Sequence, residues 1–182
     1  YYGLQSLWGF LSGLGYKADE APPNVTAAGT TTIEVDETTY ELIVEDSQFV
    51  PDQAQSVATS LVEDDEVDLL FGTANSGSAR RVIENVAKPA DTPFVVGPAA
   101  AADVTSSSEF CGENIFRASE NTAMDARSGG RYVAQNTDVE RVYIMAADYS
   151  FGQAVAANYK SVLEANGVEV VGTDFVPQGY SE

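Results

Sequence analysis

The chain has 182 residues, 44% of them hydrophobic, which fits one globular domain or one lobe of a larger protein and argues against intrinsic disorder. Its 28 acidic and nine basic side chains give a net charge of −19, and the lack of a basic patch excludes nucleic acid as a partner. Histidine is absent and Cys111 is the single cysteine, which removes the commonest general base, any internal disulfide and any zinc site built from thiols.

The acidic surplus is spread along the chain rather than gathered in a tail. At molar salt the Debye length falls to about 3 Å, so the repulsion among these carboxylates disappears while they keep the surface hydrated. The composition therefore predicts a halophilic protein, with an ordinary acidic protein as the alternative. The acidic runs at 45–46 and 64–66 lack the spacing of a calcium loop or an acid–base pair, and we interpret them as solvated surface.

The N-terminal part of the chain predicts a helix, a loop and a hairpin. Apolar residues recur at helical spacing over residues 4–14. Residues 18–30 are rich in Pro, Gly, Ala and Thr and form a predicted loop, which contains the N-glycosylation pattern at Asn24. Two β-branched runs follow, 31–35 and 40–44, and the short polar link between them is typical of a β-hairpin.

From residue 51 onward, helical and strand patterns alternate with short loops between them. The predicted helices cover residues 51–62, 77–88, 121–135 and a segment that ends at Asn166, and the predicted strands cover 67–71, 93–96, 114–117, 142–145 and 168–175. This alternation predicts an α/β fold with a doubly wound, mostly parallel sheet flanked by helices. Ligands bind beyond the carboxyl ends of the strands in such a sheet, which points to the loops 72–78, 97–103 and 146–152.

The loop 73–78 closes a predicted strand and opens a predicted helix. Its backbone N–H groups and the hydroxyls of Ser76 and Ser78 could hold an anion. The alternative is a plain helix cap, in which Ser takes its usual capping role. The loop lacks the lysine of a phosphate-binding loop and the glycine spacing of a dinucleotide site, which disfavours a nucleotide.

The loops after the next two strands offer different chemistry. The small side chains of residues 98–102 let a ligand approach the backbone, although a small-residue turn that only packs against a helix has the same composition. Tyr149 and Phe151 could stack on an apolar ligand or cover it, although an aromatic residue in a loop is more often a packing residue.

Six motifs follow one another along the chain: Glu45-Asp46-Ser47-Gln48 with Pro51-Asp52-Gln53-Ala54, residues 72–78, Gly97-Pro98-Ala99-Ala100, Asn114-Ile115-Phe116-Arg117, Asp148-Tyr149-Ser150-Phe151-Gly152-Gln153, and residues 170–179. In this order they resemble the branched-chain amino-acid type (type I) of periplasmic solute-binding protein, the receptor component of ABC importers. The resemblance covers essentially the whole chain. It implies a two-lobed, non-catalytic receptor without a cofactor, which closes on a free amino acid or a related small solute.

The resemblance also implies roles for individual residues. Ser76 would bind the ligand carboxylate, and the backbone of Ala99 would meet the α-amino and carboxylate groups. Ala101 stands where leucine, isoleucine and valine binders carry a hydroxyl residue, which leaves amides and urea-like solutes open as ligands. Phe151 matches an aromatic residue that lines the cleft, and Asn75 stands where some relatives have Cys. The predicted ligand-binding residues are Asn75, Ser76, Gly77, Ser78, Ala99, Ala100, Ala101, Tyr149 and Phe151, with no catalytic or metal-binding residue.

By the same resemblance, residues 1–182 are expected to be an incomplete N-terminal ligand-binding lobe, which lacks the family's first strand and its second lobe. The open sheet would then be either partly disordered or filled by a strand from another copy, and the second alternative implies self-association. The implied partners are a small-molecule ligand and the membrane subunits of an ABC transporter. The implied location is extracellular, at the cell surface, with a membrane anchor in the full-length protein.

Two other function classes remain open from the sequence. A ligand-sensing ectodomain of a signalling receptor shares the predicted fold, and a downstream transmembrane segment in the gene would distinguish it from a transporter component. A flavodoxin-like enzyme could use Asp148 as its acid, and turnover that depends on Asp148 would support this alternative.

Overall fold

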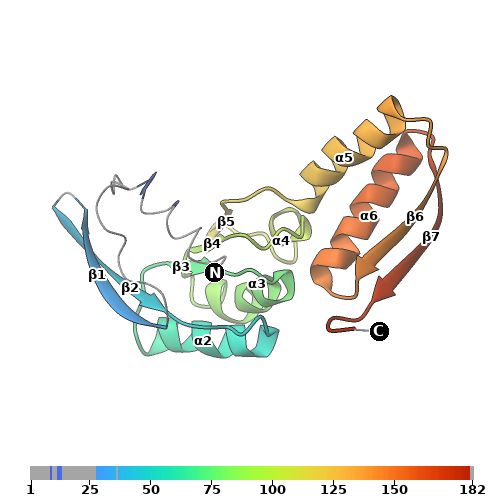
Figure 1. Cartoon of the computed structure of the whole chain (residues 1–182). Helices are drawn as coiled ribbons and strands as arrows, with labels where there is room; N and C mark the ends of the chain where they lie inside the picture. Colours follow the sequence, from blue (N-terminus) through green and yellow to red (C-terminus); the bar gives the residue numbers. More distant parts are fainter. Residues whose placement is uncertain (1–8, 10–11, 14–27, 36, 181–182) are drawn as a thin grey trace.

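The computed structural model describes residues 9, 12–13, 28–35 and 37–180. Most of the predicted helix over 4–14 and the predicted loop with its sequon at Asn24 lie outside the described residues. The described residues form an antiparallel hairpin, a central α/β unit and a second α/β unit, which lie side by side (Figure 1).

The hairpin consists of β1 (Gly29–Val35) and β2 (Thr38–Val44), paired from Gly29 with Val44 to Val35 with Thr38. It confirms the predicted hairpin, but each strand is longer than the sequence suggests. Thr38 and Thr39 pair in the ladder instead of forming the link, because β-branched threonines fit an extended, pleated backbone well.

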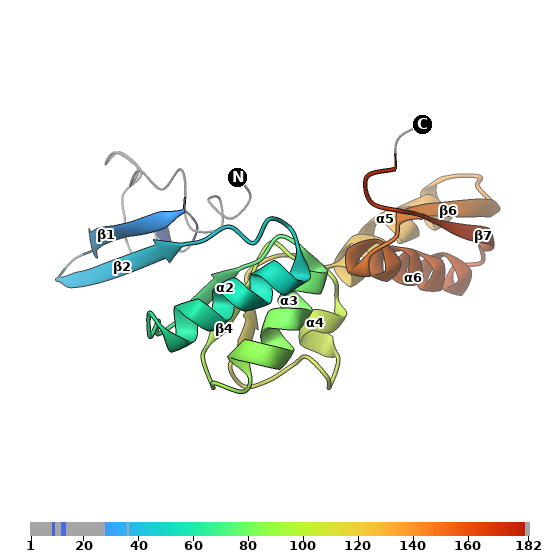
Figure 2. The ribbon, with the colours of Figure 1, turned by 90° about the horizontal axis from the view of Figure 1, so that it is seen from below.

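The central unit is built on a parallel sheet in the order β3 (Leu70–Gly72), β4 (Phe94–Val96) and β5 (Ile115–Arg117). Its helices are α2 (Pro51–Glu63), α3 (Ser76–Val82), the π-helical turn η1 (Ile83–Ala87) that continues α3, and the short α4 (Asp103–Ser106). Helix α2 runs alongside α3 (Figure 2). The buried core of the unit is made of Ala54, Ala58, Leu70, Ala79, Val82, Ile83, Val86, Ala87, Phe94, Val96, Ala99, Ala101, Val104, Phe110 and Ile115.

Helix α2 begins as the sequence predicts. Pro51 is its first residue, where the missing N–H costs no helical hydrogen bond and the fixed φ suits the helix. Ala54 and Ala58 point into the core, and their small side chains let the helix approach its neighbours closely. The strand that follows is shorter than predicted, because the chain is still turning at Glu66, which has a φ of 52°, and the Val67 N–H donates to the Leu61 carbonyl.

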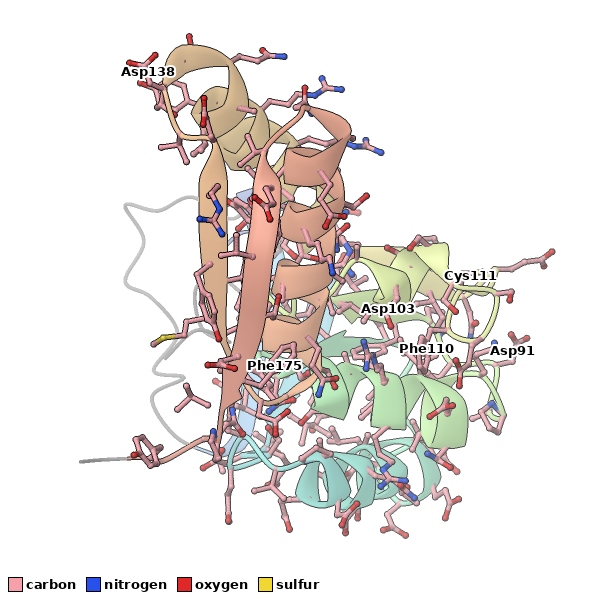
Figure 3. All side chains as sticks on the ribbon, turned by 90° about the vertical axis from the view of Figure 1, so that its right-hand side faces the viewer. Asp91, Asp103, Phe110, Cys111, Asp138 and Phe175 are labelled. Carbon is pink, nitrogen blue, oxygen red and sulfur yellow. The ribbon has the colours of Figure 1, made fainter. Side chains whose placement is uncertain are left out.

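The second unit contains α5 (Thr122–Asn136), β6 (Arg141–Ala147), α6 (Ser150–Ala165) and β7 (Glu169–Val176). Strands β6 and β7 pair in parallel, and both helices lie on one face of this sheet. Figure 3 looks onto the opposite face. Tyr143 and Met145 alternate along β6 with half-buried residues and are 54% and 74% exposed. Gly167, with a φ of 87°, ends α6 at the predicted position.

The structure confirms an α/β fold with parallel strands flanked by helices, but the strands do not form one sheet. Strands β3 to β5 and strands β6 to β7 belong to two separate parallel sheets. Periodicity identifies strands but not their partners, and here the chain turns into α5 directly after β5, with Asn121 accepting the N–H groups of Ala123 and Met124. The assignment of residues 1–182 to a single lobe stays a prediction.

Candidate functional site

The carboxyl ends of β3 and β4 bring the first two predicted loops into contact. The Gly97 N–H donates to the Gly72 carbonyl at 2.9 Å, and the Ala99 N–H donates to the Thr73 carbonyl at the same distance. The Ala101 N–H donates to Ser76 Oγ at 3.1 Å. The parallel sheet therefore places both loops at one edge, as the alternation of the sequence predicts.

Asn75, rather than a serine, caps α3. Its Oδ1 accepts the N–H groups of Gly77 and Ser78 at 2.7 and 3.1 Å, and its Nδ2 donates to the Phe49 carbonyl at 3.1 Å. The two N–H groups that could have held a ligand anion already donate to this side chain. Asn is among the best capping residues, so the signal was present in the sequence, next to serines of similar propensity.

Loss of the Asn75 side chain is expected to destabilise the protein. Asn75→Ala removes the cap of α3 and the bond that ties α3 to the turn before α2, and Asn75 is only 4% exposed. We expect the free energy of unfolding to fall by about 2 kcal/mol, which denaturant titration measures. Asn75→Ser retains a capping oxygen but loses the bond to the Phe49 carbonyl, and is expected to lose about half as much. Equal stability of wild type and Asn75→Ala would contradict this account of the cap.

Ser76 is buried, with 1% of its surface exposed, at the contact between the two loops. Its Oγ accepts the Ala101 N–H, and a hydroxyl that accepts one hydrogen bond can still donate its own proton to another acceptor. The side chains of Ala99 and Ala101 pack into the core, as the packing interpretation of this loop requires. Ala100 and Gly77 are the partly exposed members of the predicted set at this edge.

Arg117, at the end of β5, fixes the carbonyl groups of the second loop. Its Nη1 donates to the Ala99 carbonyl at 2.6 Å, its Nη2 donates to the Ala101 carbonyl at 2.7 Å, and its Nε donates to Thr105 Oγ1 at 3.1 Å. Burial lowers the pKa of Arg117, and the charge of Asp103 opposes this shift. An arginine at the carboxyl end of a strand, in a chain with few basic residues, is a signal that the sequence analysis did not use.

The salt bridge beside this loop ties α3 to α4. Arg80 Nη2 lies 2.6 Å from Asp103 Oδ2, and the guanidinium carbon of Arg80 lies 5.4 Å from the centre of the Phe110 ring. Asp103 and Phe110, the two residues that Arg80 contacts here, are labelled in Figure 3. The Asp103 carboxylate therefore has a structural partner in Arg80.

The aromatic residues of the third predicted loop lie at the start of α6. The Tyr149 and Phe151 rings are 6.0 Å apart, and Phe49, from the turn before α2, lies 6.2 Å from Tyr149. Burial raises the pKa of the Tyr149 hydroxyl above its ordinary value. The start of α6 faces the first loop, because a Cβ built on Gly77 would lie 3.4 Å from Ser150 Oγ. All three predicted loops therefore meet in one region.

The meeting point offers hydroxyl, backbone and aromatic groups rather than paired titratable ones. Asp148, the candidate acid of the enzyme alternative, is exposed, and its Oδ1 accepts a hydrogen bond from Gln153 Nε2 at 3.1 Å. Among the described residues, no group of three or more Cys, Asp or Glu side chains is placed to hold a metal ion. This chemistry suits recognition of a small polar solute.

The sequence profile of a family described as "Periplasmic binding protein" matches residues 15–182. The chain belongs to this family. Among curated protein sequences, none matches this periplasmic binding protein. Solved structures do match. Of the three structures described below, two align with nearly the whole of this chain.

A periplasmic binding protein from Burkholderia mallei is 26% identical with a TM-score of 0.73, and the alignment covers 99% of this chain and 42% of that one. A branched-chain amino acid transporter protein from Rhodopseudomonas palustris CGA009 is 26% identical with a TM-score of 0.63, covering 98% of this chain and 44% of that one. A solute-binding protein from Rhodopseudomonas palustris BisB5, in complex with 3,4-dihydroxybenzoic acid, is 26% identical with a TM-score of 0.66, covering 74% and 36%. This periplasmic binding protein chain spans less than half the length of each.

Proposed function

We propose that this chain is the ligand-binding part of an extracytoplasmic receptor that delivers a small carboxylate solute to an ABC importer. The observation that carries the proposal is the meeting of three loops at one edge, where Ser76, the partly exposed Ala100 and the aromatic start of α6 come together. Family membership supports solute binding rather than catalysis, and it implies an extracytoplasmic location.

The carboxylate is the chemistry that the candidate ligands share. A branched-chain amino acid and a hydroxylated benzoate both carry one, and two of the similar structures are a branched-chain amino acid transporter protein and a solute-binding protein in complex with 3,4-dihydroxybenzoic acid. The rings of Phe49, Tyr149 and Phe151 provide an apolar surface that suits both the side chain of a branched-chain amino acid and the ring of a benzoate. Ala101 offers no hydroxyl to an α-amino group, which favours the aromatic acid over the amino acid.

The partners and the anchoring are also part of the proposal. The membrane subunits of an ABC transporter are the expected partners, and a membrane anchor in the full-length protein is expected to keep the receptor at the cell surface. Among the described residues, no helix is both long and apolar enough to cross a bilayer. Self-association through the open sheet stays a prediction, and a mass in light scattering that does not change with concentration would count against it.

The proposal is tested by binding measurements on the protein in multimolar KCl. We expect leucine or 3,4-dihydroxybenzoate to raise the melting temperature, because a ligand that binds only the native state stabilises it by mass action. Urea and small amides serve as further probes, because an uncharged solute remains the alternative. A folded protein whose melting temperature shifts with none of these probes would overturn the proposal.

Ser76→Ala tests the site within the same assay. The change removes the hydroxyl that can donate to the ligand and leaves the Ala101 N–H without its acceptor, so we expect the dissociation constant to rise by roughly tenfold or more. Calorimetry with the probe that binds wild type measures this change. The matched control is Ser106→Ala, because Ser106 also bonds the second loop, donating to the Ala102 carbonyl, but is exposed. Equal affinity of Ser76→Ala and wild type would remove Ser76 from the site.

A further inference from the structure

Thr122 lies where the chain passes from the central unit to the second unit. It is the first residue of α5 and has 0% of its surface exposed. Its N–H donates to the Ala100 carbonyl at 2.8 Å, and its Oγ1 accepts the Ala102 N–H at 3.2 Å. Thr122 therefore holds the peptide groups on both sides of Ala101, the residue whose own N–H donates to Ser76 Oγ.

The same hydroxyl also accepts a hydrogen bond from α6 of the second unit. Asn158, on α6, donates from Nδ2 to Thr122 Oγ1 at 3.1 Å, and its position is fixed by a second bond from Nδ2 to the Ala154 carbonyl at 2.7 Å. A hydroxyl oxygen has two lone pairs, and the N–H groups of Ala102 and Asn158 occupy both. One buried atom thus joins the second loop of the site to α6, the helix that begins with the aromatic residues.

We propose that Thr122 is a positioning residue that couples the orientation of α6 to the shape of the ligand-facing loop 97–102. This inference rests on the proposed function, because it assigns a role to groups around the same site. The two parallel sheets share no strand pairing, so the units are joined by side-chain packing between α3 and α6 and by the hydrogen bonds at Thr122, which act on the loop directly. When α6 shifts, Asn158 Nδ2 leaves Thr122, and the hydroxyl that holds the Ala102 N–H is released to rotate.

The coupling has a signature that a simple packing role lacks. Asn158 does not bond the loop directly, and its link to the loop runs through Thr122. A change at Asn158 should therefore raise the amide hydrogen exchange rate of Ala102, in the other unit, while the amides of β3 and β4 keep their rates. If Asn158 only packed within the second unit, the faster exchange would stay within α5 and α6.

Amide exchange of the protein in multimolar KCl tests the coupling without any ligand. We expect Asn158→Ala and Thr122→Val to speed exchange of the Ala102 amide by roughly tenfold or more, and Thr122→Ser, which retains the hydroxyl, to restore the wild-type rate. The matched control is Asn166→Ala. Asn166 makes the same bond from Nδ2 to the carbonyl four residues earlier, Val162, but lies exposed at the end of α6. Wild-type exchange of the Ala102 amide in Asn158→Ala would overturn the inference, even if Thr122→Val failed to fold.

A second readout separates the coupling from the proposed function. With leucine or 3,4-dihydroxybenzoate, whichever binds wild type, we expect Asn158→Ala to weaken binding by about fivefold to tenfold and Asn166→Ala to leave it unchanged. Unchanged affinity in Asn158→Ala would overturn the link between coupling and binding. If wild type bound neither probe, the proposed function would fail, while the exchange rates would still decide the coupling.

Discussion

The melting temperature of this protein is expected to rise by more than about 10 °C between dilute buffer and multimolar KCl, because screening removes the repulsion among its carboxylates. Nine basic side chains can pair one to one with at most nine of the 28 acidic ones. The described pairs with more than 40% of both side chains exposed are Arg81 with Asp52, Arg141 with Glu169 and Lys160 with Glu164, and such pairs contribute little. Most of the acidic side chains are therefore screened by salt ions rather than neutralised by basic side chains of the protein.

Scanning calorimetry at several KCl concentrations measures this dependence, and two controls identify its cause. Sucrose at matched osmolarity strengthens burial without screening charge, so it is expected to raise the melting temperature less than KCl. Replacing the exposed Glu63, Asp65 and Asp68 by their amides is expected to stabilise the protein in dilute buffer and to flatten the salt dependence. Equal melting temperatures in low and high salt would show that the acidic composition is not an adaptation to salt.

The sequence was sufficient to predict most helices and strands from residue 51 onward, because their apolar periodicity is strong. It also predicted that the loops after β3 and β4 would meet, since the carboxyl ends of parallel neighbours share an edge. The division of the strands between two parallel sheets was not predictable. Each strand is only three to eight residues long and carries no local mark of its partner.

The candidate site was predicted at the level of loops but not of bonds. Ser76 was named, yet its contact with Ala101 spans 25 residues and is invisible to local patterns. Arg117 and Thr122 were missed as site residues for the same reason, because their roles depend on carbonyl and N–H groups of a loop that precedes them in the chain. The charge of Arg117, and the place of both residues at the ends of elements, are the signals that could have drawn attention to them.

Gly152 is the position where a single methyl group is expected to be most disruptive. A Cβ built there would overlap the Ala147 carbonyl, in the backbone that joins β6 to α6, and this carbonyl already accepts the Tyr149 N–H at 2.9 Å. Because a backbone group cannot swing aside as a side chain can, Gly152→Ala must displace the start of α6. We expect the free energy of unfolding to fall by about 3 kcal/mol, which denaturant titration in multimolar KCl measures.

The matched control is Gly129→Ala, which places the same methyl group on α5. There the added Cβ would meet the hydroxyl of Tyr159, the far end of a side chain that can turn away. Alanine is also more favourable than glycine within a helix by about 1 kcal/mol, so we expect the free energy of unfolding of this variant to equal or slightly exceed that of wild type. Similar stability of the two variants would refute the steric account of Gly152. A loss confined to Gly152→Ala would explain why the loop that presents Tyr149 and Phe151 ends in glycine.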